Sequence, residues 1–236
     1  MTRGSKILIV MAAGSGTRMG ASVPKQFLDL GGKPVLRRTI ETFVSAVPDI
    51  KVITVLPKEH IPFWKEYCVA NDFNCPQLLV AGGITRFHSV RNALEKVPEG
   101  AIVAIHDGVR PLLSQKLVSG MFSKMERGKI HALIPVVPSV DTLKVLDRTV
   151  SGELTDSGEG IDRSRVFGAQ TPQMFLSCDI KAAYSQAFDT SFTDDASVAS
   201  KKGIPLSFCD GERYNFKLTS PEDLALARMI ISSWPR

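Results

Sequence analysis

The residues that could do chemistry begin with a glycine-rich segment near the N-terminus. Glycines let backbone N–H groups approach an anion closely and surround it. This segment matches neither the dinucleotide fingerprint nor the P-loop, because its glycines are spaced G-x-G-x-x-x-G and no Gly-Lys-Ser/Thr follows. Its candidate nucleotide-binding residues are Ala12, Ala13, Gly14, Ser15 and Gly16.

Two cations accompany this segment. Arg18 lies within it, and Lys25 follows seven residues later, directly after Pro24. Two cations beside a glycine cradle suit a triphosphate, whose charge must be held while one phosphate bond is broken. We therefore predict that Arg18 and Lys25 are the catalytic residues of a nucleotide-phosphate site. The alternative, a glycine-rich turn with solvated basic side chains, would explain the glycines alone.

A carboxylate and a cation follow a later apolar run. In the segment His106-Asp107-Gly108-Val109-Arg110, Asp107 could hold a divalent cation or the hydroxyls of a ribose or polyol. Arg110 could form a planar fork on a phosphate. A local ion pair between Asp107 and Arg110 is the alternative. His106 has no second histidine or carboxylate at metal-ligand spacing, so we predict a hydrogen-bonded histidine beneath the site.

Weaker candidates are spread over the rest of the chain. The Gly82-Gly83 turn, with Ser89 in the helical pattern that follows, could read a nucleobase edge through exposed backbone and a hydroxyl. For another group of residues, sequence spacing does not distinguish between two alternatives. They could contact a phosphate or hydroxyl group of a ligand, or they could be solvated surface side chains. These are Thr142, Lys144, Arg163, Thr171 and Lys217.

Composition and missing motifs exclude several classes of function. The 236 residues are 44% hydrophobic and 22% charged, as in a globular protein, and we expect no membrane span. A net charge of +5 suits an anionic ligand, but no basic run with interleaved aromatics indicates nucleic acid. There is no G-x-S-x-G or H-E-x-x-H motif. Four cysteines without a C-x-x-C pair predict core thiols in a reducing, cytoplasmic setting rather than zinc or disulfides.

Apolar, β-branched runs alternate with helical patterns along the chain. Strands buried on both faces are predicted at Lys6–Met11, 52–56, Gln77–Ala81, 101–106 and 131–137, and helices at 34–47, 86–97 and 114–127. This alternation predicts right-handed crossovers and a three-layer α/β sandwich with a mostly parallel, Rossmann-like sheet. Ligands of such sheets bind at the C-terminal ends of strands, where several of the candidate residues lie.

The alternation breaks between residues 138 and 167, which are strongly polar. A β-hairpin arm that reaches a second subunit and a plain surface loop both fit this segment. Beyond it we predict helices at 177–188 and 194–202, strands at 206–209 and 214–218, and a last helix with Ser220 as N-cap, Pro221 at the first position and Asp223 at the third. No linker divides the chain, so we expect one domain over 1–236, with 138–167 as a dimerisation arm.

In their order and separation these motifs resemble those of the 2-C-methyl-D-erythritol 4-phosphate cytidylyltransferases, nearly end to end. The motifs are the glycine segment with Arg18, Pro24-Lys25-Gln26, Gly82-Gly83 with Arg86 and Ser89-Val90, His106-Asp107 with Arg110-Pro111, Asp141-Thr142, Thr171-Pro172-Gln173, Thr193-Asp194-Asp195-Ala196, and Lys217 with Pro221-Glu222-Asp223-Leu224. Members of this family transfer CMP from CTP to methylerythritol phosphate, with magnesium, in the non-mevalonate isoprenoid pathway.

The resemblance implies a role for each candidate residue. Arg18 and Lys25 would stabilise the transition state, and the backbone and side chains at Ala13, Gly14, Gly83 and Ser89 would surround the cytidine. The polyol phosphate would lie among Asp107, Arg110, Thr142, Arg163, Thr171 and Lys217. In a homodimer, Thr142 and Arg163 would come from the arm of the partner subunit. Mg²⁺ would be held mainly by the phosphates of CTP.

Two rival functions stay open at this point. One is a ribitol 5-phosphate cytidylyltransferase of the same superfamily, which shares the chemistry and much of the motif set. The other is a catalytically silent nucleotide-binding protein on the same fold. The Asp195-Ala196-Ser197 continuation and the 217–224 segment favour methylerythritol phosphate as substrate.

Overall fold

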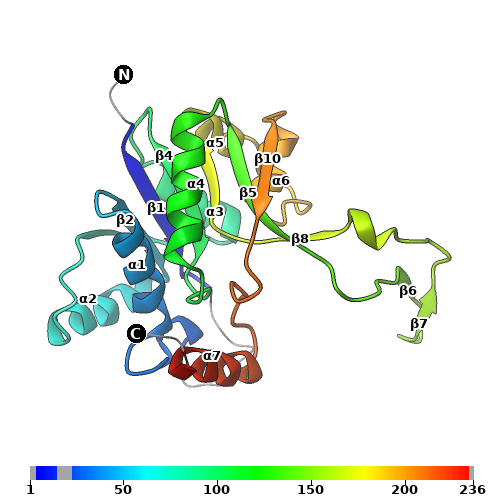
Figure 1. The fold of residues 1–236 in the computed structure, drawn as a ribbon, viewed down its shortest axis with the longest axis horizontal. Helices are drawn as coiled ribbons and strands as arrows, with labels where there is room; N and C mark the ends of the chain where they lie inside the picture. The colour runs from blue at the N-terminus through cyan, green and yellow to red at the C-terminus, as the bar shows by residue number, and fades with distance from the viewer. Residues whose placement is uncertain (1–3, 15–22, 234–236) are drawn as a thin grey trace.

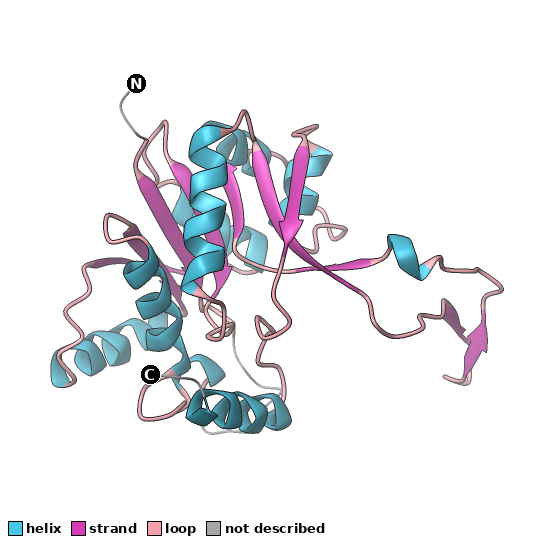
Figure 2. Cartoon of the chain, viewed as in Figure 1, coloured by secondary structure: helices cyan, strands magenta, loops and turns pink. Residues whose placement is uncertain are grey.

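The computed structural model describes residues 4–14 and 23–233, and it has a central sheet with helices on both faces (Figures 1 and 2). Within these residues the main sheet has eight strands. They are β1 (Lys6–Met11), β2 (Lys51–Leu56), β3 (Gln77–Ala81), β4 (Ile102–Asp107), β5 (Ala132–Pro138), β8 (Phe167–Ala169), β9 (Gln173–Leu176) and β10 (Leu206–Asp210). The helices are α1 (Val35–Ala46), α2 (Ile61–Ala70), α3 (Arg86–Leu94), α4 (Gln115–Arg127), α5 (Ser177–Tyr184), α6 (Asp195–Lys201) and α7 (Pro221–Ser233).

The order of strands in the sheet is β10-β5-β9-β4-β1-β2-β3, and β8 pairs with β5. The pairs β1–β2, β1–β4, β2–β3 and β5–β10 are parallel. The pairs made by β8 and β9 are antiparallel. The predicted three-layer α/β sandwich with a mostly parallel sheet is therefore confirmed.

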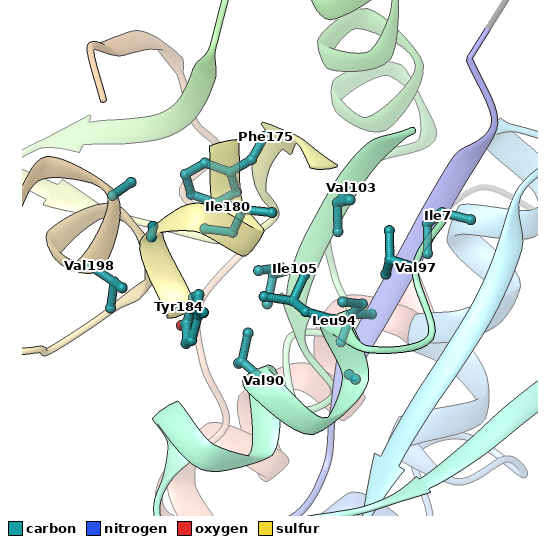
Figure 3. Close-up of a cluster of buried hydrophobic side chains, with 14 of the residues drawn as sticks. Ile7, Val90, Leu94, Val97, Val103, Ile105, Phe175, Ile180, Tyr184 and Val198 are labelled. Carbon is teal, nitrogen blue, oxygen red and sulfur yellow. The ribbon is translucent and has the colours of Figure 1, made fainter. Parts of the chain in front are cut away.

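Alternating side chains of the strands build a core on each face of the sheet. In β1, Ile7 and Ile9 pack with α3, α5 and α6 on one face, where Val90, Ile180 and Tyr184 also lie (Figure 3). Leu8 and Val10 pack on the other face with α1, α2 and α4. A third, smaller cluster joins α7 to the start of α1 and to Leu218. Within the described residues, these layers leave the C-terminal ends of β1, β3 and β4 open as a place for a site.

Helix starts follow the predicted capping chemistry. The hydroxyl of Ser220 accepts a hydrogen bond from the N–H of Asp223 at 3.3 Å, and the Asp223 carboxylate accepts one from the N–H of Ser220 at 2.9 Å. These reciprocal bonds satisfy N–H groups that the first turn of α7 would leave unpaired. The predicted N-cap at Ser220 is confirmed.

Several expectations about elements are wrong. No strand forms at 214–218, where the N–H of Leu218 donates to Val109 O and the side chain of Asn215 donates to Thr171 O. The two buried residues there, Asn215 and Leu218, are buried by packing and side-chain hydrogen bonds rather than by strand pairing. The helix α2 was not predicted from the sequence, and neither was β9, a strand of four residues that inserts antiparallel between β4 and β5. The predicted helices at 86–97 and 177–188 end early, at Leu94 and Tyr184.

Two predictions about burial also need correction. The strand β3 lies at the edge of the sheet, and Leu78 is 48% exposed, so β3 is not buried on both faces. The four cysteines are free, as predicted, but they are half-buried or exposed rather than core thiols. No helix in the described part of the chain has the length and apolarity needed to cross a bilayer.

The segment 138–167 contains a short hairpin, β6 (Leu146–Arg148) with β7 (Leu154–Asp156). Figure 1 shows this hairpin at the tip of an arm that projects from the sheet between β5 and β8. Large apolar side chains along it are exposed, among them Val140, Val150 and Leu154. A hairpin this small buries too little surface to be stable alone, so the arm is suited to packing against another surface.

Candidate functional site

A cleft of about 520 Å³ lies at the C-terminal ends of β1, β3 and β4. It brings together many of the residues predicted from the sequence: Ala12, Ala13, Gly14, Lys25, Gly83, Ser89, Asp107 and Lys217. A larger cleft of about 800 Å³, between α1 and α7, contains none of the predicted residues. Ser15, Gly16 and Arg18 lie outside the residues that the structure describes.

The wall of the cleft after β3 is a turn that requires glycine. A Cβ at Gly83 would lie 2.6 Å from the Cβ of His88, and one at Gly82 would lie 2.6 Å from the Cβ of Ala13. The hydroxyl of Ser89 accepts a hydrogen bond from the N–H of Gly83 at 2.9 Å and donates one to Thr85 O at 2.9 Å. Ser89 is buried, and its hydroxyl therefore fixes the backbone that lines the cleft.

Asp107 is the centre of a group of charges at the end of β4. Its Oδ2 lies 3.1 Å from Lys217 Nζ and 3.2 Å from Arg110 Nε. Burial by itself would raise the pKa of Asp107, but Lys217, Arg86 and Arg110 together hold that pKa well below its usual range. The ion pair with Arg110, which the sequence left open as the alternative to a functional role, is present, and Lys217 joins it. Asp107 is a carboxylate at every physiological pH.

His106 lies directly beneath this carboxylate and is fully buried. Its Nε2 donates to Arg110 O at 3.1 Å, and its Nδ1 accepts from the hydroxyl of Thr171 at 3.0 Å. The same hydroxyl accepts from the N–H of Asp107 at 3.1 Å, so Thr171 uses its only donor inside the protein. The prediction of a hydrogen-bonded histidine beneath the site is confirmed.

Burial lowers the pKa of His106 from its ordinary value of 6.5 to about 4. Between these two values the unfolded chain binds more protons than the folded one. The contribution of the neutral imidazole to the free energy of unfolding is therefore complete above pH 6.5. It decreases by about 3 kcal/mol as the pH falls towards 4.

We expect the NMR titration of the His106 ring C2 proton to have its midpoint near pH 4. The signal is assigned, among the four histidines, as the one that disappears in His106→Gln. A midpoint near 6.5 would contradict the buried, neutral assignment.

The irregular segment after β10 contacts one cation that lines the cleft, Lys25, and one that pairs with Asp107, Arg110. Lys25 Nζ donates to Leu218 O at 3.0 Å, and Arg110 Nη1 donates to Asn215 O at 2.8 Å. Lys217, which contacts Asp107, lies between these two carbonyl groups in the chain. The 215–218 backbone thereby connects the glycine side of the cleft to the Asp107 side.

Five candidates do not line the cleft of their own chain: Arg110 and Thr171 contact Asp107, which does line it, and the other three lie on the arm. Thr142, Lys144 and Arg163 are exposed on the arm, and Arg163 Nη1 donates to Val140 O at 3.2 Å. None of them lines the cleft.

Two further residues of the cleft wall, Gln26 and Arg86, have contacts that were not predicted from the sequence. Gln26 is buried and donates to the carbonyl oxygens of Ala12 and Gly14. Arg86 forms two hydrogen bonds with the buried carboxylate of Asp195, at 2.7 and 2.6 Å. Both residues stand in the motifs quoted for the family resemblance, but spacing alone cannot pair side chains that are 109 positions apart.

The cleft offers little that could hold a metal by itself. Among residues 4–14 and 23–233 there is no cluster of three or more His, Cys, Asp or Glu side chains placed for one ion. Asp107 is the one carboxylate among the described residues that line the cleft. Mg²⁺ is usually bound through one or two carboxylates plus substrate phosphates, so this donor set fits a metal that arrives with a nucleotide.

Comparison with known proteins identifies close relatives. The family model described as "IspD: 2-C-methyl-D-erythritol 4-phosphate cytidylyltransferase" matches residues 6–233. The 2-C-methyl-D-erythritol 4-phosphate cytidylyltransferase of Bacteroides fragilis is 42% identical over 224 residues, which are 94% of this chain and 98% of that protein. The enzyme of the same name from Porphyromonas gingivalis is 42% identical over 95% of this chain and 97% of its own length.

Solved structures agree with these sequence matches. The 4-diphosphocytidyl-2C-methyl-D-erythritol synthase of Anaerococcus prevotii superposes with a TM-score of 0.78 at 28% identity, covering 97% of this chain and 99% of that one. The 2-C-methyl-D-erythritol 4-phosphate cytidylyltransferase of Thermus thermophilus gives a TM-score of 0.74 at 28% identity, with 97% and 99% covered.

Proposed function

The chain belongs to the 2-C-methyl-D-erythritol 4-phosphate cytidylyltransferase family, and from this premise we propose that it transfers CMP from CTP to 2-C-methyl-D-erythritol 4-phosphate. The products are pyrophosphate and 4-diphosphocytidyl-2-C-methyl-D-erythritol. The observation that carries this proposal is the convergence of Lys25, Asp107 and Lys217 on one cleft at the C-terminal ends of parallel strands. Open α/β sheets bind their ligands at this position.

The reaction needs positioning and charge stabilisation more than proton transfer. A phosphate oxygen of the acceptor attacks the α-phosphorus of CTP in line, and the bond from that phosphorus to the oxygen shared with the β-phosphate breaks. The attacking phosphate is already ionised at neutral pH, so no general base is required. Lys25 stabilises the charge that develops on the triphosphate, and Arg18 is proposed to do the same.

The acceptor phosphate is proposed to bind on the Asp107 side of the cleft. Lys217 and Arg110 both lie there, within 3.2 Å of the Asp107 carboxylate. The carboxylate suits the hydroxyl groups of a polyol, while the two cations suit its phosphate. Thr171 supports this wall through its bonds to Asp107 and His106.

Magnesium is proposed as the cofactor. Asp107 would hold it together with the phosphates of CTP, because Arg110 and Lys217 both contact this carboxylate at Oδ2, on the side away from Oδ1. When bound, the ion would neutralise charge on the triphosphate. The protein's own residues supply the remaining contacts.

The active form is proposed to be a homodimer in the cytoplasm. Exposed apolar residues along the arm favour its burial against a second subunit. Thr142 and Arg163 would then reach the polyol phosphate in the partner's cleft. Four free cysteines are consistent with a reducing compartment.

The rival functions are less well supported. The relatives reported above are named as methylerythritol phosphate cytidylyltransferases, which favours that acceptor over ribitol phosphate. A silent binding protein would have little use for Lys25, since a protein that never breaks the α–β bond needs no cation to stabilise that step.

We expect CTP to be used about 100-fold better than UTP, ATP or GTP, since a buried polar base edge left unpaired is costly. Excess EDTA should abolish turnover. Release of pyrophosphate from each nucleotide, measured with methylerythritol phosphate as acceptor, checks both expectations. Equal use of ATP, or full activity in EDTA, would contradict them.

A further inference from the structure

The glycine-rich wall of the cleft is held by one buried amide side chain. Gln26 belongs to the short 3₁₀ helix Lys25–Phe27 and is 1% exposed. Its Nε2 donates to Ala12 O at 2.8 Å and to Gly14 O at 3.3 Å. Both neighbours are carbonyl oxygens, which only accept, so the orientation of the amide follows from its partners.

These two bonds join positions that lie on either side of residues 15–22 in the chain. Ala12 and Gly14 precede that segment, and Lys25, the neighbour of Gln26, follows it. Lys25 is itself anchored, since its Nζ donates to Leu218 O at 3.0 Å. The Gln26 amide therefore fixes the separation between the glycine backbone and the Lys25 ammonium group.

We propose that Gln26 is a positioning residue, which sets the Lys25 ammonium and the glycine backbone at the spacing that the triphosphate of CTP requires. This inference rests on the proposed function. A residue that only filled space would need no amide, because a buried amide destabilises the fold unless it is hydrogen-bonded.

Two substitutions separate positioning from packing. Gln26→Met keeps the size of the side chain and removes both donors. We expect it to lower kcat by about 100-fold and to raise the KM for CTP, because small displacements of reacting groups are costly. The KM for methylerythritol phosphate should stay unchanged, since the Asp107 side of the cleft is not touched.

Gln26→Glu has a sharper signature. An ionised carboxylate would face two carbonyl oxygens, whereas a protonated carboxyl can donate one hydrogen bond to Ala12 O. Burial and that bond both raise the carboxyl pKa, so the ratio of variant to wild-type kcat should rise about tenfold as the pH falls from about 8.5 to about 6. Gln26→Met should show no such pH dependence.

The matched control is Gln77→Glu. Gln77 is half-buried in β3, and its Oε1 accepts from Thr54 and Trp64, outside the cleft. This variant reports the general effect of a carboxylate placed in the protein interior. We expect its kcat ratio to be independent of pH. Urea unfolding shows which variants are folded. If Gln26→Glu does not fold, the kcat and KM of Gln26→Met alone test the inference.

The outcomes are distinct. A folded Gln26→Met with wild-type kcat and KM for CTP would overturn the inference, and so would a flat pH ratio in folded Gln26→Glu. A wild-type protein that releases no pyrophosphate would contradict the proposed function instead. In that case the affinity for CTP, measured by calorimetric titration in the presence of Mg²⁺, still tests whether Gln26 is a positioning residue. Weaker binding by Gln26→Met than by Gln77→Glu supports positioning, and equal binding overturns it.

Discussion

Lys25→Ala is expected to lower kcat by about 100- to 1,000-fold, which corresponds to about 2.7 to 4 kcal/mol of lost transition-state stabilisation. Lys25 lines the cleft, and its Nζ is held by Leu218 O, so the ammonium group is preorganised before CTP binds. Charge grows on the triphosphate as the α–β bond breaks. The KM for CTP should therefore change much less than kcat.

The matched control for this substitution is Lys58→Ala, at an exposed lysine in the short helix Lys58–His60, outside the cleft. Steady-state kinetics on both purified variants, with folding checked by circular dichroism, provide the measurement. A folded Lys25→Ala with near-normal kcat would end the catalytic assignment. The catalytic role of Arg18 is predicted from the sequence alone, and Arg18→Ala is expected to lower kcat as Lys25→Ala does.

The second large effect concerns the arm. Arg163→Ala is expected to abolish nearly all activity although Arg163 lies outside the cleft of its own chain. In a two-fold dimer each composite site would take Lys25 from one subunit and Arg163 from the other. Lys25→Ala and Arg163→Ala homodimers should therefore both be nearly inactive.

Mixing the two variants restores one intact site per mixed dimer. When unfolded chains are combined in equal amounts and refolded, about half of the dimers are mixed, so activity should return to roughly a quarter of the wild-type level. Native mass spectrometry shows whether mixed dimers are present. If they are present and activity stays at the level of the separate variants, Arg163 does not act across the interface.

The parts of the fold that were predictable are those with a local pattern. Runs such as Lys6–Met11 are buried on both faces in a parallel sheet, and this leaves a clear apolar signature. The segment 214–218 resembles a strand in sequence because the apolar residues Tyr214, Phe216 and Leu218 alternate with polar ones, although no strand of the described residues pairs with it. Its conformation depends on contacts with Val109 and Arg110, which are distant in sequence.

The candidate site also has a part that was predictable from local sequence and a part that was not. Glycines and charges that follow strands were predictable, since the C-terminal ends of parallel strands meet at one edge of the sheet. The contacts of Lys25 with Leu218 O and of Arg86 with Asp195 were not, because each joins residues more than 100 positions apart. The role of Thr171 was also hidden, because its hydroxyl faces His106 inside the protein.

The most direct test of the proposed function is the choice of acceptor. Purified protein with CTP and Mg²⁺ is given either 2-C-methyl-D-erythritol 4-phosphate or ribitol 5-phosphate, and pyrophosphate release is measured alongside ³¹P NMR of the diphosphate product. We predict release, with formation of 4-diphosphocytidyl-2-C-methyl-D-erythritol, from the methylerythritol compound. Release from ribitol 5-phosphate alone would contradict the proposed substrate, and release from neither acceptor would contradict the proposed activity.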